Sequence, residues 1–186
     1  MRLAGVDIGM DNVGLFTLGL DNDTIDPIDG RTVVSDPTVF VYPTGNAGDL
    51  KIQYMVTSVV NYVSAFNIQM VVIEQPFFAQ THAHAVLRLY RLFWGIIDAL
   101  KEIHPTIEVR AITAPKARSL IGYKRALGRN VKDAVLTALS NLEVSKHIDY
   151  TKYSEHALDA LVVALAQCVS ITRLSLIHGE LKCLKK

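Results

Sequence analysis

The spacing of apolar residues along this 186-residue chain predicts strands in some stretches and helices in others. Short apolar runs rich in β-branched residues are typical of strands, and apolar residues three and four positions apart are typical of helices. The predicted strands are residues 3–8, 13–20, 38–42, 69–74 and 107–112, with a turn-rich connection through Pro27, Gly30 and Pro37. The predicted helices are residues 49–66, 80–103, a short one after a loop at 113–115, 131–139 capped by Asn130, and 154–169.

This order of elements indicates a fold class. Three strands, a helix, a strand, a helix, a strand and further helices predict an α/β fold, with a mixed sheet of about five strands and helices on both faces. No repeat, linker or low-complexity stretch interrupts the order, so we expect one domain over residues 1–186. Residues 171–186 are expected either to dock as a last amphipathic helix or to form a basic tail.

Composition limits the environment of the chain. It is 50% hydrophobic and 20% charged, which is typical of a folded globular protein. No apolar run is long enough for a membrane span, the first residues do not resemble a secretion signal, and the spacing of Cys168 and Cys183 suggests neither a disulfide framework nor a zinc site. We therefore expect a cytoplasmic protein of a bacterium or a virus-infected host cell, with no membrane partner and no small-molecule cofactor.

A polar patch lies at the start of the last predicted helix. Ser154 can cap its N-terminus, and His156 and Asp159 are three positions apart. Glu155 and Asp159 are four apart, so two or three metal-binding side chains share one face. The alternative is that the two acids only favour the positive end of the helix dipole and that His156 makes an ordinary hydrogen bond.

Two more acids lie at the ends of apolar strands. Asp7 ends the first predicted strand, and Glu74 ends a later one just before Pro76. The carboxyl ends of strands are where open α/β sheets bind ligands. Carboxylates suit magnesium or manganese. Two such ions about 4 Å apart would suit phosphodiester hydrolysis.

Charge is unevenly distributed, although the net charge is only +1. Residues 1–50 contain eight Asp and two Arg, a balance of 2 − 8 = −6. Residues 113–132 contain six basic residues and no acidic one. The first region is expected to hold cations. For the second, phosphate binding is favoured over an ordinary solvated surface, since no acid interrupts it.

Several of these pieces occur together in one known family. They are Val6-Asp7-Ile8-Gly9 with Asn12 and Gly14, Ile73-Glu74-Gln75, Pro115-Lys116, Lys132, and His156-Ala157-Leu158-Asp159-Ala160. In this order and at this spacing, over nearly the full length, the chain resembles the RuvC-like Holliday junction resolvases of the ribonuclease H-like superfamily.

The resemblance implies a metal site. Asp7, Glu74 and Asp159 match the three acidic ligands of the family, and His156 matches a position that carries Asp or His. Glu155 is a departure, because it could replace or assist His156 as a ligand. Two magnesium ions per site are implied, with manganese as a substitute.

The resemblance also implies contacts with DNA. Phe77 matches an aromatic residue that stacks on bases at the crossover, and Phe78 is its neighbour; covering a small core is the alternative for each ring. Lys116 and Lys132 match lysines that approach the scissile phosphate. The other expected DNA contacts are Arg118, Lys124, Arg125 and Arg129.

The function implied is a magnesium-dependent endonuclease that resolves Holliday junctions by paired symmetric nicks. A homodimer is expected because the junction is nearly two-fold symmetric, and helix 80–103 with Trp94 is either its interface or an ordinary core helix. The alternatives are a related nuclease acting on flaps, forks or RNA, and a silent DNA-binding module. A further alternative comes from the Asp7-Ile8-Gly9 turn, which also resembles the phosphate loop of sugar kinases and actin-like ATPases. Those proteins need a second such domain, so this alternative is disfavoured.

Overall fold

A computed structural model describes residues 1–21, 24–34, 47–77, 83–123, 131–142 and 148–172. Its strands are β1 (Arg2–Ile8), β2 (Asn12–Asp21), β3 (Thr24–Val34), β4 (Met70–Gln75) and β5 (Glu108–Thr113). Its helices are α1 (Ala47–Ala65), α2 (Ala83–Ile103), α3 (Ala114–Leu120), α4 (Val131–Ser140) and α5 (Glu155–Thr172), with a 3-10 turn at Tyr150–Lys152.

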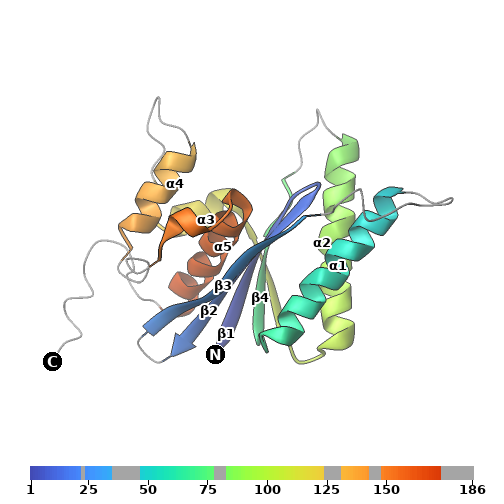
Figure 1. The fold of residues 1–186 in the computed structure, drawn as a ribbon, viewed down its shortest axis with the longest axis horizontal. Helices are drawn as coiled ribbons and strands as arrows, with labels where there is room; N and C mark the ends of the chain where they lie inside the picture. The colour runs from blue at the N-terminus through green and yellow to red at the C-terminus, as the bar shows by residue number, and fades with distance from the viewer. Residues whose placement is uncertain (22–23, 35–46, 78–82, 124–130, 143–147, 173–186) are drawn as a thin grey trace.

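The five strands form one mixed sheet in the order β3-β2-β1-β4-β5 (Figure 1). β2 pairs antiparallel with both β1 and β3, whereas β4 pairs parallel with β1 and with β5. Parallel neighbours need a long crossover, and α1 and α2 supply the two crossovers. The mixed five-stranded sheet predicted from the sequence is confirmed.

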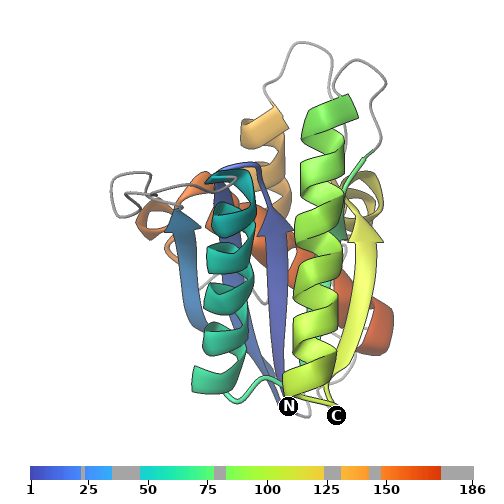
Figure 2. The ribbon, with the colours of Figure 1, turned by 90° about the vertical axis from the view of Figure 1, so that its right-hand side faces the viewer.

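Helices cover both faces of the sheet, as the sequence predicts. α1 and α2 lie on one face, and α3, α4 and α5 on the other (Figures 1 and 2). Each face has its own hydrophobic core: one joins Met55, Val59 and Ile96 to the sheet, and the other is built around α5. Almost every described residue of α5 from Ala157 to Cys168 is buried, which explains its nearly continuous apolar sequence. No helix among the described residues is long and apolar enough to cross a membrane.

The turn-rich connection predicted after the second strand is wrong. β3 occupies Thr24–Val34, which the sequence pattern assigns to a turn-rich connection, and residues 38–42 lie outside the described residues. Pro27 is tolerated because β3 is the edge strand, where a missing N–H costs no ladder bond. The pairing register also shifts between Thr17 and Leu18 of β2, opposite Pro27.

The loop predicted at residues 113–115 is also wrong in part. Ala114 and Pro115 form the first turn of α3, and only Thr113 precedes the helix. Proline fits there because the first-turn N–H groups have no partner within the helix. Asn130, most of the loop 122–128, the predicted helical start at 80–82 and residues 173–186 lie outside the described residues.

Candidate active site

Asp7 and Glu74 lie on neighbouring strands at the same edge of the sheet. β1 and β4 run parallel, and their last paired residues are Val6 and Ile73. Asp7 and Glu74 follow these directly, so both side chains stand at the carboxyl end of the central strands. Asp7 is only 8% exposed, and Glu74 is half-buried. The structure therefore places the two acids side by side at this edge.

Two glycines let α5 approach this edge closely. A Cβ on Gly5 would collide with the backbone carbonyl of Ala160, and a Cβ on Gly14 with that of His156. Gly14 is also the cross-strand partner of Asp7. The first turns of α5 therefore lie directly on β1 and β2 beside Asp7.

The start of α5 is fixed by a cap, as predicted. The backbone N–H of Ala157 donates to the Ser154 Oγ at 3.2 Å, and Ser154 also hydrogen-bonds to Thr32 of β3. The cap ties the first turn of the helix to the edge strand. This turn carries His156 and, one turn on, Asp159.

Both ring nitrogens of His156 have partners. Nδ1 lies 2.9 Å from Asp7 Oδ2, and Nε2 lies 3.3 Å from the side-chain nitrogen of Asn12. Asn12 is the first residue of β2, and its backbone carbonyl accepts a hydrogen bond of 2.8 Å from the N–H of Gly9. The turn between β1 and β2 thus holds His156 against Asp7.

Burial and neighbouring acids raise the pKa values of the acids at this edge. Burial, followed by the nearby charges of Asp7 and Asp159, raises the pKa of Glu74 to about 7. Burial and then the charge of Asp7 raise the pKa of Asp159 to about 6. The pKa of Asp7 is also raised, mainly by burial, although its hydrogen bond from His156 opposes this. Acids at a sheet edge whose pKa values are raised by burial and by neighbouring charges are typical of a functional site.

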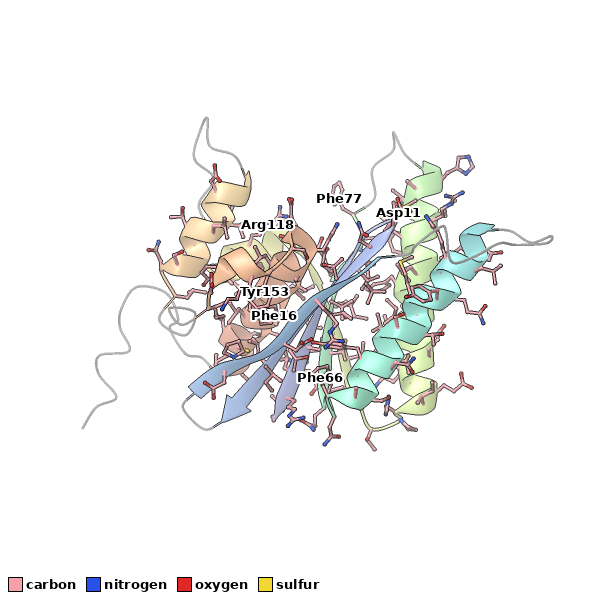
Figure 3. The ribbon with its side chains drawn as sticks, viewed as in Figure 1. Asp11, Phe16, Phe66, Phe77, Arg118 and Tyr153 are labelled. Atoms are coloured by element: carbon pink, nitrogen blue, oxygen red, sulfur yellow. The ribbon has the colours of Figure 1, made fainter. Side chains whose placement is uncertain are left out.

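Arg118 of α3 is the basic residue that acts on all three acids. Its positive charge lowers the pKa values of Asp7, Glu74 and Asp159, against the effect of burial. Figure 3 shows Arg118 near the same end of the sheet as Phe77 and Asp11. The sequence places Arg118 only among general DNA contacts, so its position beside the acids is a finding of the structure.

The other predicted residues are less closely tied to the acids. Glu155 is exposed, but its charge raises the pKa values of Asp7 and Asp159. Lys116 is exposed on α3. Lys132 is the second residue of α4, and its side chain is outside what the structure describes. Phe78, Lys124, Arg125 and Arg129 lie outside the described residues.

Phe77 projects into solvent just beyond β4. Its side chain is 79% exposed, so the expectation that it covers a small core is not met (Figure 3). The residue before it is held in place, because the Tyr90 hydroxyl of α2 donates to the Pro76 carbonyl at 3.1 Å. An exposed aromatic ring thus follows the strand that carries Glu74, next to a backbone carbonyl held by α2.

The acids are the kind of ligands that a hard divalent cation prefers. Within the described residues, no group of three or more His, Cys, Asp or Glu side chains is already arranged to hold a metal ion. Burial, and after it the charge of neighbouring carboxylates, raises the pKa values of Glu74 and Asp159, and a bound cation would favour their ionised forms. By its chemistry the donor set fits magnesium or manganese.

Sequence reasoning missed the roles of Asn12 and Gly14, although both belong to the matched motif. Their importance depends on α5, which is more than 130 residues away in the chain. A glycine and an amide just after the acid of a strand were the available signals. Neither signal predicts that α5 is the helix that packs against these two residues.

Solved structures with the same fold include several resolvases. RuvC of Thermus thermophilus in complex with a Holliday junction substrate matches with a TM-score of 0.69 and 16% identity, over 90% of this chain and 93% of that chain. The chain has the fold of the RuvC-like resolvases. The fowlpox virus resolvase complexed with Holliday junction DNA matches with a TM-score of 0.53 and 18% identity, over 91% of this chain and 98% of the viral protein.

A third structure with the RuvC-like fold is the yeast mitochondrial Holliday junction resolvase Ydc2. It matches with a TM-score of 0.57 and 10% identity, over 88% of this chain and 76% of that chain. No protein-family model and no curated protein sequence matches the chain. At these identities the structural likeness establishes the fold.

Proposed function

We propose that this protein is a magnesium-dependent, structure-selective endonuclease that resolves Holliday junctions. The observation that carries the proposal is the meeting of Asp7, Glu74 and Asp159, from β1, β4 and α5, at one edge of a RuvC-like fold. The solved neighbours include two resolvases bound to Holliday junction DNA, which supports a branched-DNA substrate.

In this proposal the three acids hold the cations, with His156 or Glu155 completing the set. Bound magnesium would supply an activated water and stabilise the leaving oxygen of the phosphodiester. Asp7 is the central acid, because burial and its hydrogen bond to His156 fix its carboxylate. Manganese is expected to substitute for magnesium, since it accepts the same oxygen ligands.

Basic residues on the α3 side are proposed to bind the DNA backbone. Arg118 stands close enough to the acids to meet the negative charge of the scissile phosphate. Lys116 and Lys132 are proposed to contact the same or neighbouring phosphates, and Lys124, Arg125 and Arg129 the backbone further along. Such contacts supply salt-dependent affinity that is independent of sequence.

Phe77 is proposed to stack on a base at the opened crossover, with Phe78 beside it. An exposed aromatic ring on a fixed backbone suits this role, since stacking contributes about 1–3 kcal/mol per base. That free energy would help to keep bases unpaired at the point where the strands exchange.

The active form is proposed to be a homodimer. Paired cuts in a nearly two-fold symmetric junction need two active sites related by a two-fold axis. α2 presents Leu87 and Trp94, which are 57% and 55% exposed and lie two turns apart on one stripe of the helix. This stripe is the proposed contact with a second copy.

The test is cleavage of a labelled four-way junction beside a flap, a linear duplex and an RNA–DNA hybrid, with magnesium or with a chelator. Symmetric, magnesium-dependent nicks in the junction, far faster than cutting of the other substrates, are expected. Equal or faster cutting of the flap or of the hybrid would contradict the proposal that the junction is the preferred substrate. Tight junction binding without any cutting would indicate a silent binding module.

A further inference from the structure

The hydrogen bonds of His156 restrict where its protons can be. An ionised carboxylate only accepts hydrogen bonds, so the 2.9 Å contact with Asp7 requires a proton on Nδ1. A neutral imidazole carries one N–H, so Nε2 must then accept. The partner of Nε2 is the side-chain amide nitrogen of Asn12, a donor, at 3.3 Å.

The surroundings of the ring favour this single arrangement. A Cβ on Gly9 would come within 3.4 Å of His156 Cε1, so the ring lies against the turn that follows β1. The Gly9 N–H bond to the Asn12 carbonyl closes that turn and places the Asn12 side chain beside Nε2. The backbone of His156 is itself fixed against Gly14. Ring and amide are therefore positioned by the same turn.

We infer that Asn12 is a positioning residue that donates to His156 Nε2, selects the Nδ1–H form of the ring and so directs that N–H to the carboxylate of Asp7. Asn12 thus acts on the acid through His156. In this form only Nε2 has a free lone pair with which His156 could bind a cation, and the Asn12 amide occupies that lone pair. The hydrogen bond from Asn12 would therefore have to break before His156 could become a metal ligand.

The importance of this contact for cleavage rests on the proposed function, but the form of the ring does not. Residues behind a metal site typically change activity by about 10- to 100-fold when they are replaced. We expect Asn12→Asp to slow single-turnover cleavage by about that factor. A carboxylate at this position can only accept, so Nε2 must carry a proton in the variant.

The direct test is nitrogen NMR of protein labelled with 15N-histidine, with the chelator present and at a pH where the ring is neutral. The His156 signals are assigned by their loss in His156→Gln. The unaltered protein is expected to show the Nδ1–H form with Nε2 unprotonated, and Asn12→Asp is expected to show a proton on Nε2 as well, because both partners of the ring then only accept. Asn61→Asp adds the same charge at an exposed position of α1 and should leave the spectrum of His156 unchanged.

A second measurement separates positioning from a merely structural role. Asn12→Ala should slow cleavage in the unaltered background but cause no further loss in His156→Ala, because Asn12 acts through that ring. Independent losses in the two backgrounds would contradict the inference. So would an Nε2–H ring in the unaltered protein, or a ring unaffected by Asn12→Asp. A protein that showed the expected ring forms but cut no DNA would overturn the proposed function and leave the link between Asn12 and His156 intact.

Discussion

The carboxyl of Glu74 lies where burial and two neighbouring acids oppose its ionisation. Its pKa rises from 4.5 to about 7, so the folded state binds a proton more tightly than the unfolded state. Stability is therefore lost as the pH rises from the unfolded value through the folded value, and the whole loss is present above about pH 7. The acid thus weakens the fold at the pH where it would hold a cation.

Glu74→Gln should therefore stabilise the metal-free protein. We expect its free energy of unfolding in chelator to exceed that of the unaltered protein by about 1–3 kcal/mol above about pH 7, with no gain below about pH 4. Denaturant unfolding over this pH range measures the difference. The exposed Glu102→Gln on α2 should show no such gain. A Glu74→Gln protein that was less stable at alkaline pH would contradict the cause assigned to the raised pKa.

At the scale of elements, the contact of α5 with β2 decides whether the acids meet. Gly14→Ala should push the first turn of α5 away, since the added Cβ would meet the rigid backbone carbonyl of His156. Overpacking of this kind costs about 1–3 kcal/mol. We expect denaturant unfolding to show this decrease in the free energy of unfolding. Junction cleavage should fall by a larger factor, because His156 and Asp159 move with the helix.

Gly19→Ala on the same strand is the matched control for this prediction. Its Cβ would meet the flexible end of Ile28 at 3.3 Å, and that side chain can move. Cleavage by Gly19→Ala should remain near that of the unaltered protein. If the two variants lost equal activity, close approach of α5 at Gly14 would not explain the site.

The elements that the sequence predicts correctly are those with strong periodicity. The buried runs of β1 and β4 and the apolar stripes of α1 and α2 are clear in the sequence, and the ends of the strands gave Asp7 and Glu74. β3 was missed because Pro27, Gly30 and its aspartates are turn formers, and only the edge position makes them acceptable in a strand.

The parts of the site that could not be predicted depend on tertiary packing. Arg118 stands among six basic residues, and no local pattern distinguishes the one that faces the acids. Asn12 gains its contact with His156 only when α5 lies across β2. Residue type and spacing were enough to predict the acids. The residues that surround them, Arg118 and Asn12, could be recognised only from the folded structure.

At the scale of the whole molecule, the proposed dimer can be tested through α2. Trp94→Glu places a charge in the exposed stripe of the helix, where a second copy is proposed to pack. We expect light scattering to change from dimer to monomer, and paired nicks to become single nicks. Ile28→Glu alters a side chain of β3 that is 41% exposed and should leave the dimer unchanged. A Trp94→Glu protein that remained dimeric would exclude this stripe as the interface.

The central claim is that Asp7 belongs to a cation-dependent site that cuts Holliday junctions. The most direct measurement compares the unaltered protein with Asp7→Asn on one labelled four-way junction, recording binding and magnesium-dependent nicking of each strand. Asn keeps the size of the side chain but removes the charge, so we expect binding to be retained or tightened and both nicks to disappear. Nicking by Asp7→Asn at the rate of the unaltered protein would contradict the claim.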